Sequence, residues 1–93
     1  MSTTYNGWTN YQTWVTKLWL DNEPGTSEDM TRLTKRRRDS AVSVHGDVIR
    51  EYVQEAYQLP TSGLAADLIG SALDLVNWVE IAEAYREDAE DEE

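Results

Sequence analysis

The 93-residue sequence contains no cysteine, no phenylalanine and a single histidine, His45. Without cysteine the chain has no disulfides, no thiolate metal sites and no cysteine nucleophile. A lone histidine does not make a histidine metal site, and neither His45 nor Lys17 has a nucleophile at a recognisable spacing. The sequence also lacks a nucleophile elbow and a phosphate-binding glycine loop. We therefore predict that the protein is not an enzyme and uses no metal and no cofactor.

Long apolar runs are missing as well. No stretch approaches the ~20 apolar residues that cross a membrane. The first ten residues are polar and aromatic and lack the basic start of a secretion signal. We therefore expect a soluble, cytoplasmic protein with no membrane contact. A chain of 93 residues that is 40% hydrophobic has material for one domain with one core.

Apolar residues recur at helical spacing over most of the chain, and no alternating pattern indicates a strand. The sequence therefore predicts an all-α fold. We expect a single compact domain of four to five short helices over residues 1–89, followed by an acidic tail at 90–93. The predicted helices cover residues 10–21, 42–58, 63–75 and 78–88, and a further helix runs from a cap at Thr26 or Ser27 to about residue 39.

Two of these helices differ sharply in their apolar content. The segment 63–75 is the most apolar, which predicts that it is the central helix. The segment that ends near residue 39 has only Met30 and Leu33 on its apolar side. It is predicted to be the most exposed helix.

Negative charge dominates the composition, with 18 acidic against 8 basic residues and a net charge of −10. Such a surface repels nucleic acid and attracts basic surfaces. Asp47, Glu51 and Glu55 recur every four residues and so form a row along one side of a helix, at a spacing of ~6 Å. The other candidate partner-binding acids are Asp67, Asp74, Glu80, Glu83 and Glu87.

Rigid carboxylate rows of this kind can imitate a nucleic-acid backbone and occupy a basic groove. One alternative is a solvated helix surface that only keeps the protein soluble. A related alternative is a structural accessory protein whose acidity is an adaptation to high salt.

Five of the eight cations lie in one short segment: Arg32, Lys35, Arg36, Arg37 and Arg38. This basic segment is typical of a phosphate or acidic-patch contact. Internal neutralisation by Glu28, Asp29 and Asp39 explains it equally well. A small nucleic-acid-binding or regulatory module that uses this segment is therefore the alternative function.

Residues 5–19 hold three tryptophans and two tyrosines. A platform on which bases stack would need cations beside these rings, and Lys17 is the only one there. We therefore favour a core-forming helix with Trp8 folded back over it.

The sequence NGWTNYQTW at residues 6–14, continued by LWLDN at 18–22, resembles a family of small proteins with the pattern NGWTNYxTW…LWxDN. That family is met in phages, plasmids and other mobile elements. Residues 62–68 and 76–83 are similar to its second half, whereas the basic segment lies outside the resemblance. The family supplies no activity to transfer. The resemblance implies a small accessory protein of a mobile element. Some accessory proteins of this kind counter host defence.

Together these features predict an inhibitor of a host nucleic-acid-handling defence complex, of the anti-CRISPR or antirestriction type. The expected partner is a protein complex with a basic nucleic-acid groove. The inhibitor would bind it through acidic helical surfaces, with DNA mimicry as one way to do so. Direct contact with nucleic acid is the less favoured alternative, and a homodimer stays open.

Overall fold

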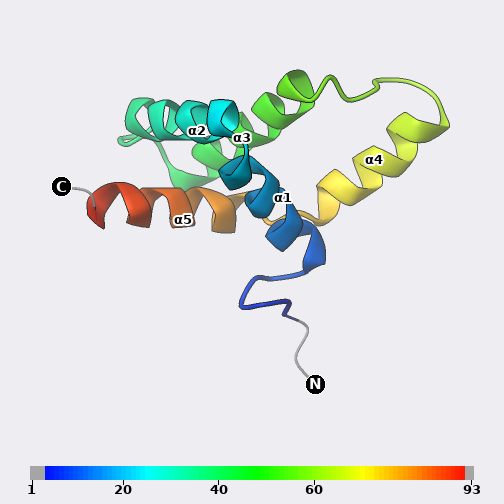
Figure 1. Cartoon of the computed structure of the whole chain (residues 1–93). Coiled ribbons are helices and arrows are strands. Elements are labelled where there is room, and N and C mark those ends of the chain that lie inside the picture. Colours follow the sequence, from blue (N-terminus) through cyan, green and yellow to red (C-terminus); the bar gives the residue numbers. More distant parts are fainter. Residues whose placement is uncertain (1–3, 92–93) are drawn as a thin grey trace.

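Five helices make up the computed structural model, which describes residues 4–91 (Figure 1). They are α1 (Tyr11–Asn22), α2 (Pro24–Arg36), α3 (Val42–Ala56), α4 (Leu64–Leu75) and α5 (Trp78–Asp91). The described residues contain no strand, only an isolated bridge between Tyr5 and Trp8. The prediction of an all-α, single-domain fold is confirmed.

The helix starts follow local capping rules. The Asn10 side chain caps α1 by accepting a hydrogen bond from the backbone N–H of Thr13. Asn77 does the same for α5 through the N–H of Glu80, as the spacing of these residues predicts. By contrast, α2 starts at Pro24 and not after Thr26 or Ser27. Proline suits the first helical position because its missing N–H would have no intrahelical partner there.

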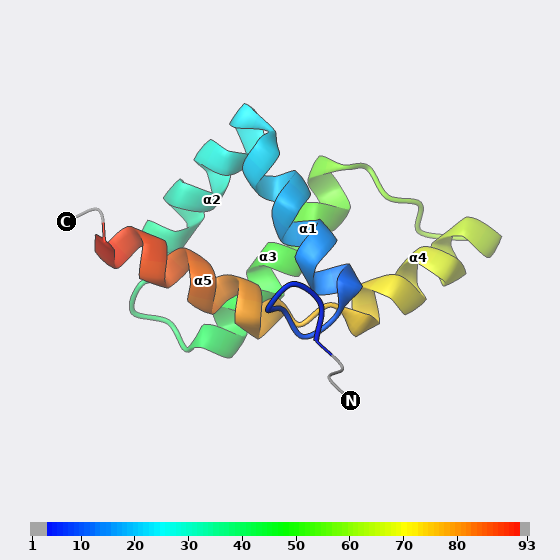
Figure 2. The same cartoon turned by 60° about the horizontal axis from the view of Figure 1, so that its bottom comes forward.

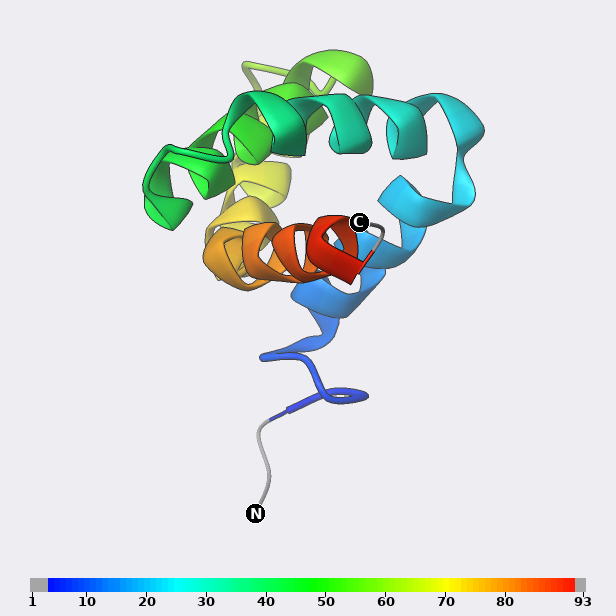
Figure 3. The same ribbon diagram turned by 90° about the vertical axis from the view of Figure 1, so that its left-hand side faces the viewer.

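The centre of the molecule is α5, which contacts α1, α2 and α3 (Figures 2 and 3). Trp78, Ile81, Ala82 and Tyr85 are the buried side of α5. The other helices contribute the remaining buried apolar side chains, which are Leu20, Met30, Ile49, Val53 and Leu73, with Val76 from the α4–α5 connection.

The prediction that the segment 63–75 is central is wrong. In the structure α4 packs mainly against α1, and Figures 1 and 2 show it standing away from the other helices. Leu64, Leu68 and Leu75 are 77%, 63% and 53% exposed. High apolar content shows that a helix has a large surface to cover, but not that this chain covers it.

The prediction that the second helix is the most exposed is also wrong. Met30 is completely buried in the core, and Thr26 and Thr34 are buried beside it. Both hydroxyls donate to backbone carbonyls, Thr26 to Leu20 at 2.9 Å and Thr34 to Met30 at 2.7 Å. Threonine can therefore be buried here without an unsatisfied polar group, which makes α2 a helix of the core.

The predicted acidic tail at 90–93 begins inside a helix, because α5 continues to Asp91. Residues 92–93 lie outside the described part of the chain.

Candidate protein-binding surfaces

The aromatic motif starts with a tight turn. Asn6 and Gly7 both have positive φ, 49° and 88°. Tyr5 and Trp8, on either side, exchange two backbone hydrogen bonds of 2.8 Å. A turn with two successive positive φ values favours asparagine followed by glycine. The turn directs Trp8 back onto the core, as predicted, where it is half-buried.

The polar residues of the motif hold the start of α5. Asn10 donates from Nδ2 to the carbonyl of Leu75 at 2.6 Å. The backbone N–H of Asn77 donates to the hydroxyl of Thr13 at 2.9 Å, and Asn77 Nδ2 donates to that of Thr9 at 3.2 Å. Residues 6–14 are therefore bonded to the segment 76–83. This network joins the N-terminal motif to the α4–α5 connection.

Lys17, the cation among the motif aromatics, is buried and has a structural role. Its ammonium lies 4.4 Å from the ring centroid of Tyr85 and 6.0 Å from that of Trp8. It also pairs with Asp21 at 2.5 Å, and Asp21 accepts a hydrogen bond of 2.8 Å from the Tyr85 hydroxyl. Burial, together with this hydrogen bond, raises the pKa of Tyr85 far above its usual value. The motif therefore offers no free cation for a base-stacking platform.

The acid row Asp47, Glu51 and Glu55 lies on the solvent side of α3, and all three side chains are exposed. Ile49 and Val53, on the opposite side of the helix, are buried in the core. Among the described residues none of the three carboxylates forms an ion pair. The core fixes the position of the row while its charges stay available.

The other predicted acids differ in their exposure and in their bonding partners. Asp67, Glu83 and Glu87 are exposed. Asp74 is exposed too, but its carboxylate pairs with Arg50 of α3 at 2.7 Å. Glu80 is half-buried and accepts a hydrogen bond of 3.0 Å from the backbone N–H of Thr9. Glu80 therefore belongs to the network around the motif.

The basic segment spans the end of α2 and the turn after it. Its five side chains are all exposed. Arg32 pairs with Asp29 at 2.6 Å, which confirms part of the expected internal neutralisation. Asp29 also accepts a hydrogen bond of 2.6 Å from the Tyr52 hydroxyl. The bonds from Tyr52 and then Arg32 lower the pKa of Asp29.

His45 is completely buried at the contact between α3 and α5. Its Nδ1 accepts a hydrogen bond of 3.1 Å from Nε of Arg86. A second nitrogen of the Arg86 guanidinium, Nη2, donates to the carbonyls of Arg37 and Ser40 at 2.8 and 2.7 Å. Burial, and then the charges of Arg86 and Arg37, lower the pKa of His45 to about 4. His45 thus helps hold the turn between α2 and α3. Within the described residues there is no cluster of three metal-ligating side chains.

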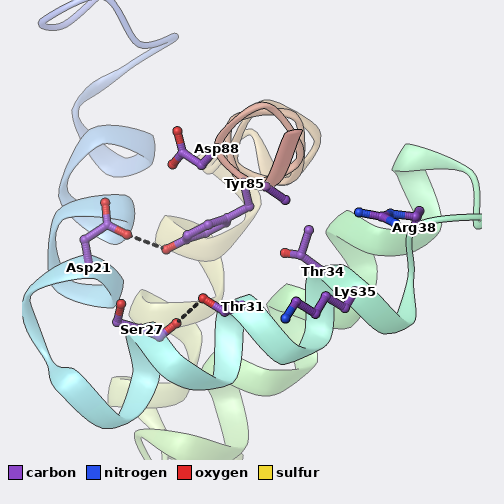
Figure 4. Close-up of a pocket in the computed structure, with 9 residues that line it drawn as sticks. Asp21, Ser27, Thr31, Thr34, Lys35, Arg38, Tyr85 and Asp88 are labelled. Carbon is purple, nitrogen blue, oxygen red and sulfur yellow. Dashed lines mark hydrogen bonds between the residues drawn. The ribbon is translucent and has the colours of Figure 1, made fainter. Parts of the chain in front are cut away.

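A polar pocket of about 570 Å³ opens beside α2 and α5, next to Asp21 at the end of α1 (Figure 4). Its wall combines carboxylates (Asp21, Asp88), cations (Lys35, Arg38), hydroxyls (Ser27, Thr31, Thr34) and the aromatic Tyr85. Several of these groups are already engaged: Thr31 donates to the carbonyl of Ser27 and Tyr85 donates to Asp21. Charges of both signs indicate no single class of ligand.

Sequence reasoning missed the exposed apolar side of α4. Leu64, Leu68 and Leu75 follow at intervals of four and seven residues, which places them on one side of the helix. Ile69 and Leu73 lie on another side and pack on the domain. The signal was in the sequence: the apolar residues span more of the helix circumference than a single neighbour covers.

No helix in the described part of the chain combines the length and apolar character needed to span a bilayer. The chain has no match among the curated proteins or the solved structures. Residues 1–91 match the model of a family of unknown function, DUF7249, and the chain therefore belongs to that family.

Proposed function

We propose that this chain is a non-catalytic inhibitor that binds a nucleic-acid-handling defence complex of its host, encoded by a mobile element and acting in the cytoplasm. The acid row Asp47, Glu51 and Glu55 is the proposed contact. The observation that carries the proposal is that all three carboxylates are exposed and free of ion pairs within the described residues, on a helix held by the core.

The physical argument is one of preorganisation. A basic groove that normally holds DNA or RNA gains most from anionic groups already fixed in space, because little side-chain and backbone freedom is lost on binding. A folded helix supplies such groups, and the net charge of −10 adds long-range attraction toward the groove. Binding would then compete with nucleic acid for the same site.

The test uses purified CRISPR effector and restriction complexes, with DNA cleavage as the readout. The row variant Asp47→Asn/Glu51→Gln/Glu55→Gln should lose inhibition by at least tenfold. A matched control, Glu28→Gln/Asp39→Asn/Asp88→Asn, removes the same number of exposed charges elsewhere and should inhibit like the wild type. Excess DNA should relieve the inhibition. If the row variant binds each responsive complex as tightly as the wild type, the proposal is wrong.

One observation favours a second function, direct nucleic-acid binding through the basic segment. Lys35, Arg36 and Arg37 are exposed, and none of them forms an ion pair with another described residue. A mobility shift of DNA or RNA at low salt, weakened by added salt and by Lys35→Gln/Arg36→Gln/Arg37→Gln, would support this function. No shift at low salt would exclude it.

A further inference from the structure

Three exposed leucines line one side of α4, and other large apolar side chains, such as Tyr11 and Trp19 of α1, are exposed elsewhere on the surface. Leu64, Leu68 and Leu75 form a stripe about three turns long, and each is more than half exposed. Single exposed leucines are ordinary, but several on one side of a helix mark a candidate contact site. We call Leu64, Leu68 and Leu75 the α4 stripe.

The domain itself does not cover the α4 stripe. α4 is attached through Ile69 and Leu73, which pack on the core, and through the Asp74–Arg50 ion pair. The start of the helix follows a long connection from α3 and points away from the other helices (Figures 1 and 2). The helix is therefore held at one end and on one side, and the stripe faces solvent.

Both charged side chains of α4 are acidic, and one of them, Asp74, is paired with Arg50 of α3. Asp67 lies one turn after Leu64, and Asp74 directly precedes Leu75. The α4 sequence contains these two acids and no cation. A second copy of the chain would bring the same two acids and another −10 of net charge to the contact. An occupant with leucine-like side chains between Lys or Arg residues complements both the apolar stripe and its acidic edge.

We infer that the α4 stripe is a docking site for an amphipathic helix of another protein, apolar on one side with Lys or Arg along its edges. A 12-residue helix is ~18 Å long, so it matches about three turns of a partner helix. Recognition would follow the helix-to-helix mode, with apolar anchors at spacings of three and four residues. The inference shares with the proposed function only the premise that the chain binds other proteins. The docking site is a different surface from the acid row.

The test measures fluorescence anisotropy of three labelled 18-residue helical peptides with the intact chain. The first has leucines on one side and lysines along the edges, the second replaces lysine by glutamate, and the third replaces leucine by serine. The first should bind at least tenfold more tightly than either of the others. Equal binding of the second or third peptide overturns the inference.

Variants of the chain locate the contact. Leu64→Ser/Leu68→Ser should weaken binding of the leucine–lysine peptide at least tenfold, with the helical circular dichroism unchanged. The matched control Leu18→Ser/Val44→Ser removes two other exposed apolar side chains and should stay within twofold of the wild type. Equal losses in both variants overturn the inference. So does a dimer in sedimentation equilibrium that only the α4 variant dissociates, because the occupant is then a second copy.

The acid-row variant separates this inference from the proposed function. Asp47→Asn/Glu51→Gln/Glu55→Gln should lose inhibition of the defence complex but bind the leucine–lysine peptide within about threefold of the wild type. A row variant that keeps inhibition contradicts the proposed function alone. An α4 variant that keeps peptide binding contradicts the docking site alone.

Discussion

The backbone N–H of Asn77 donates a hydrogen bond of 2.9 Å to the hydroxyl of Thr13, which stands 64 positions earlier in the chain. Thr13 is completely buried, and its own hydroxyl donates to Asn10 Oδ1 at 2.7 Å. One hydroxyl thus links the cap of α1 to the connection that leads into α5.

Replacing Thr13 by valine should destabilise the fold. Valine has almost the same shape but leaves the Asn77 N–H without its acceptor, at a cost of about 1–3 kcal/mol. Urea unfolding followed by tryptophan fluorescence measures the free energy of unfolding. The control Thr31→Val removes an exposed hydroxyl that bonds only within α2 and should change stability by less than about 0.5 kcal/mol. Equal effects at the two positions would show that the long-range bond adds nothing.

Two helical glycines should respond to alanine in opposite ways. A Cβ on Gly46 would lie 3.0 Å from the backbone carbon of Trp78 and 3.1 Å from its oxygen, so α3 and α5 must move apart. We expect a loss of about 1–3 kcal/mol for Gly46→Ala. A Cβ on Gly70 in α4 meets nothing within 4 Å. Gly70→Ala should therefore raise the free energy of unfolding by about 0.5–1 kcal/mol. Stabilisation by both changes would contradict the close contact at Gly46.

His45 should make stability depend on pH. Its folded pKa of about 4 lies below its ordinary value of 6.5, so protonation favours the unfolded chain. Its contribution is complete above about pH 6.5 and is lost as the pH falls toward 4. Between pH 7.5 and 5, the wild type should lose about 2 kcal/mol more than His45→Gln, which has no titrating group at this position. Identical pH profiles in urea unfolding would contradict this assignment.

Salt should stabilise the protein. With a net charge of −10 the folded chain repels itself, and screening shortens the reach of that repulsion from ~30 Å at 0.01 M to ~3 Å at 1 M salt. Thermal unfolding in a sodium chloride series should show a rising midpoint. The row variant Asp47→Asn/Glu51→Gln/Glu55→Gln should show a shallower rise. A wild type that unfolds at low salt and needs molar salt to fold would favour the high-salt structural alternative over the inhibitor.

Local signals predicted most of the helices well. The predicted segment 63–75 matches α4 (Leu64–Leu75), and 42–58 matches α3 (Val42–Ala56). Gly46 lies within α3, at the point where the backbone of Trp78 comes closest. Capping rules predict a start of α2 after Thr26 or Ser27, but the helix begins at Pro24. In the structure the Thr26 hydroxyl lies within donating distance of two carbonyls, that of Leu20 in α1 and that of Glu23 directly after α1.

The candidate surfaces were predictable only in part. The acid row is exposed on α3 because helical periodicity puts it opposite Ile49 and Val53, which any core would bury. Glu80 differs because its hydrogen-bond donor, Thr9, lies 71 positions away. The apolar content of α4 predicts a core position for the α4 stripe, because composition does not reveal whether another helix lies against it.

The sequence by itself determined the helical class, most helix boundaries and the order of charges along each helix, because periodicity and capping act over a few residues. Only the tertiary structure decided that α5 is central, that Met30, Lys17 and His45 are buried, and that three leucines of α4 face solvent. Those outcomes depend on which helices meet, and therefore on contacts between residues far apart in the chain.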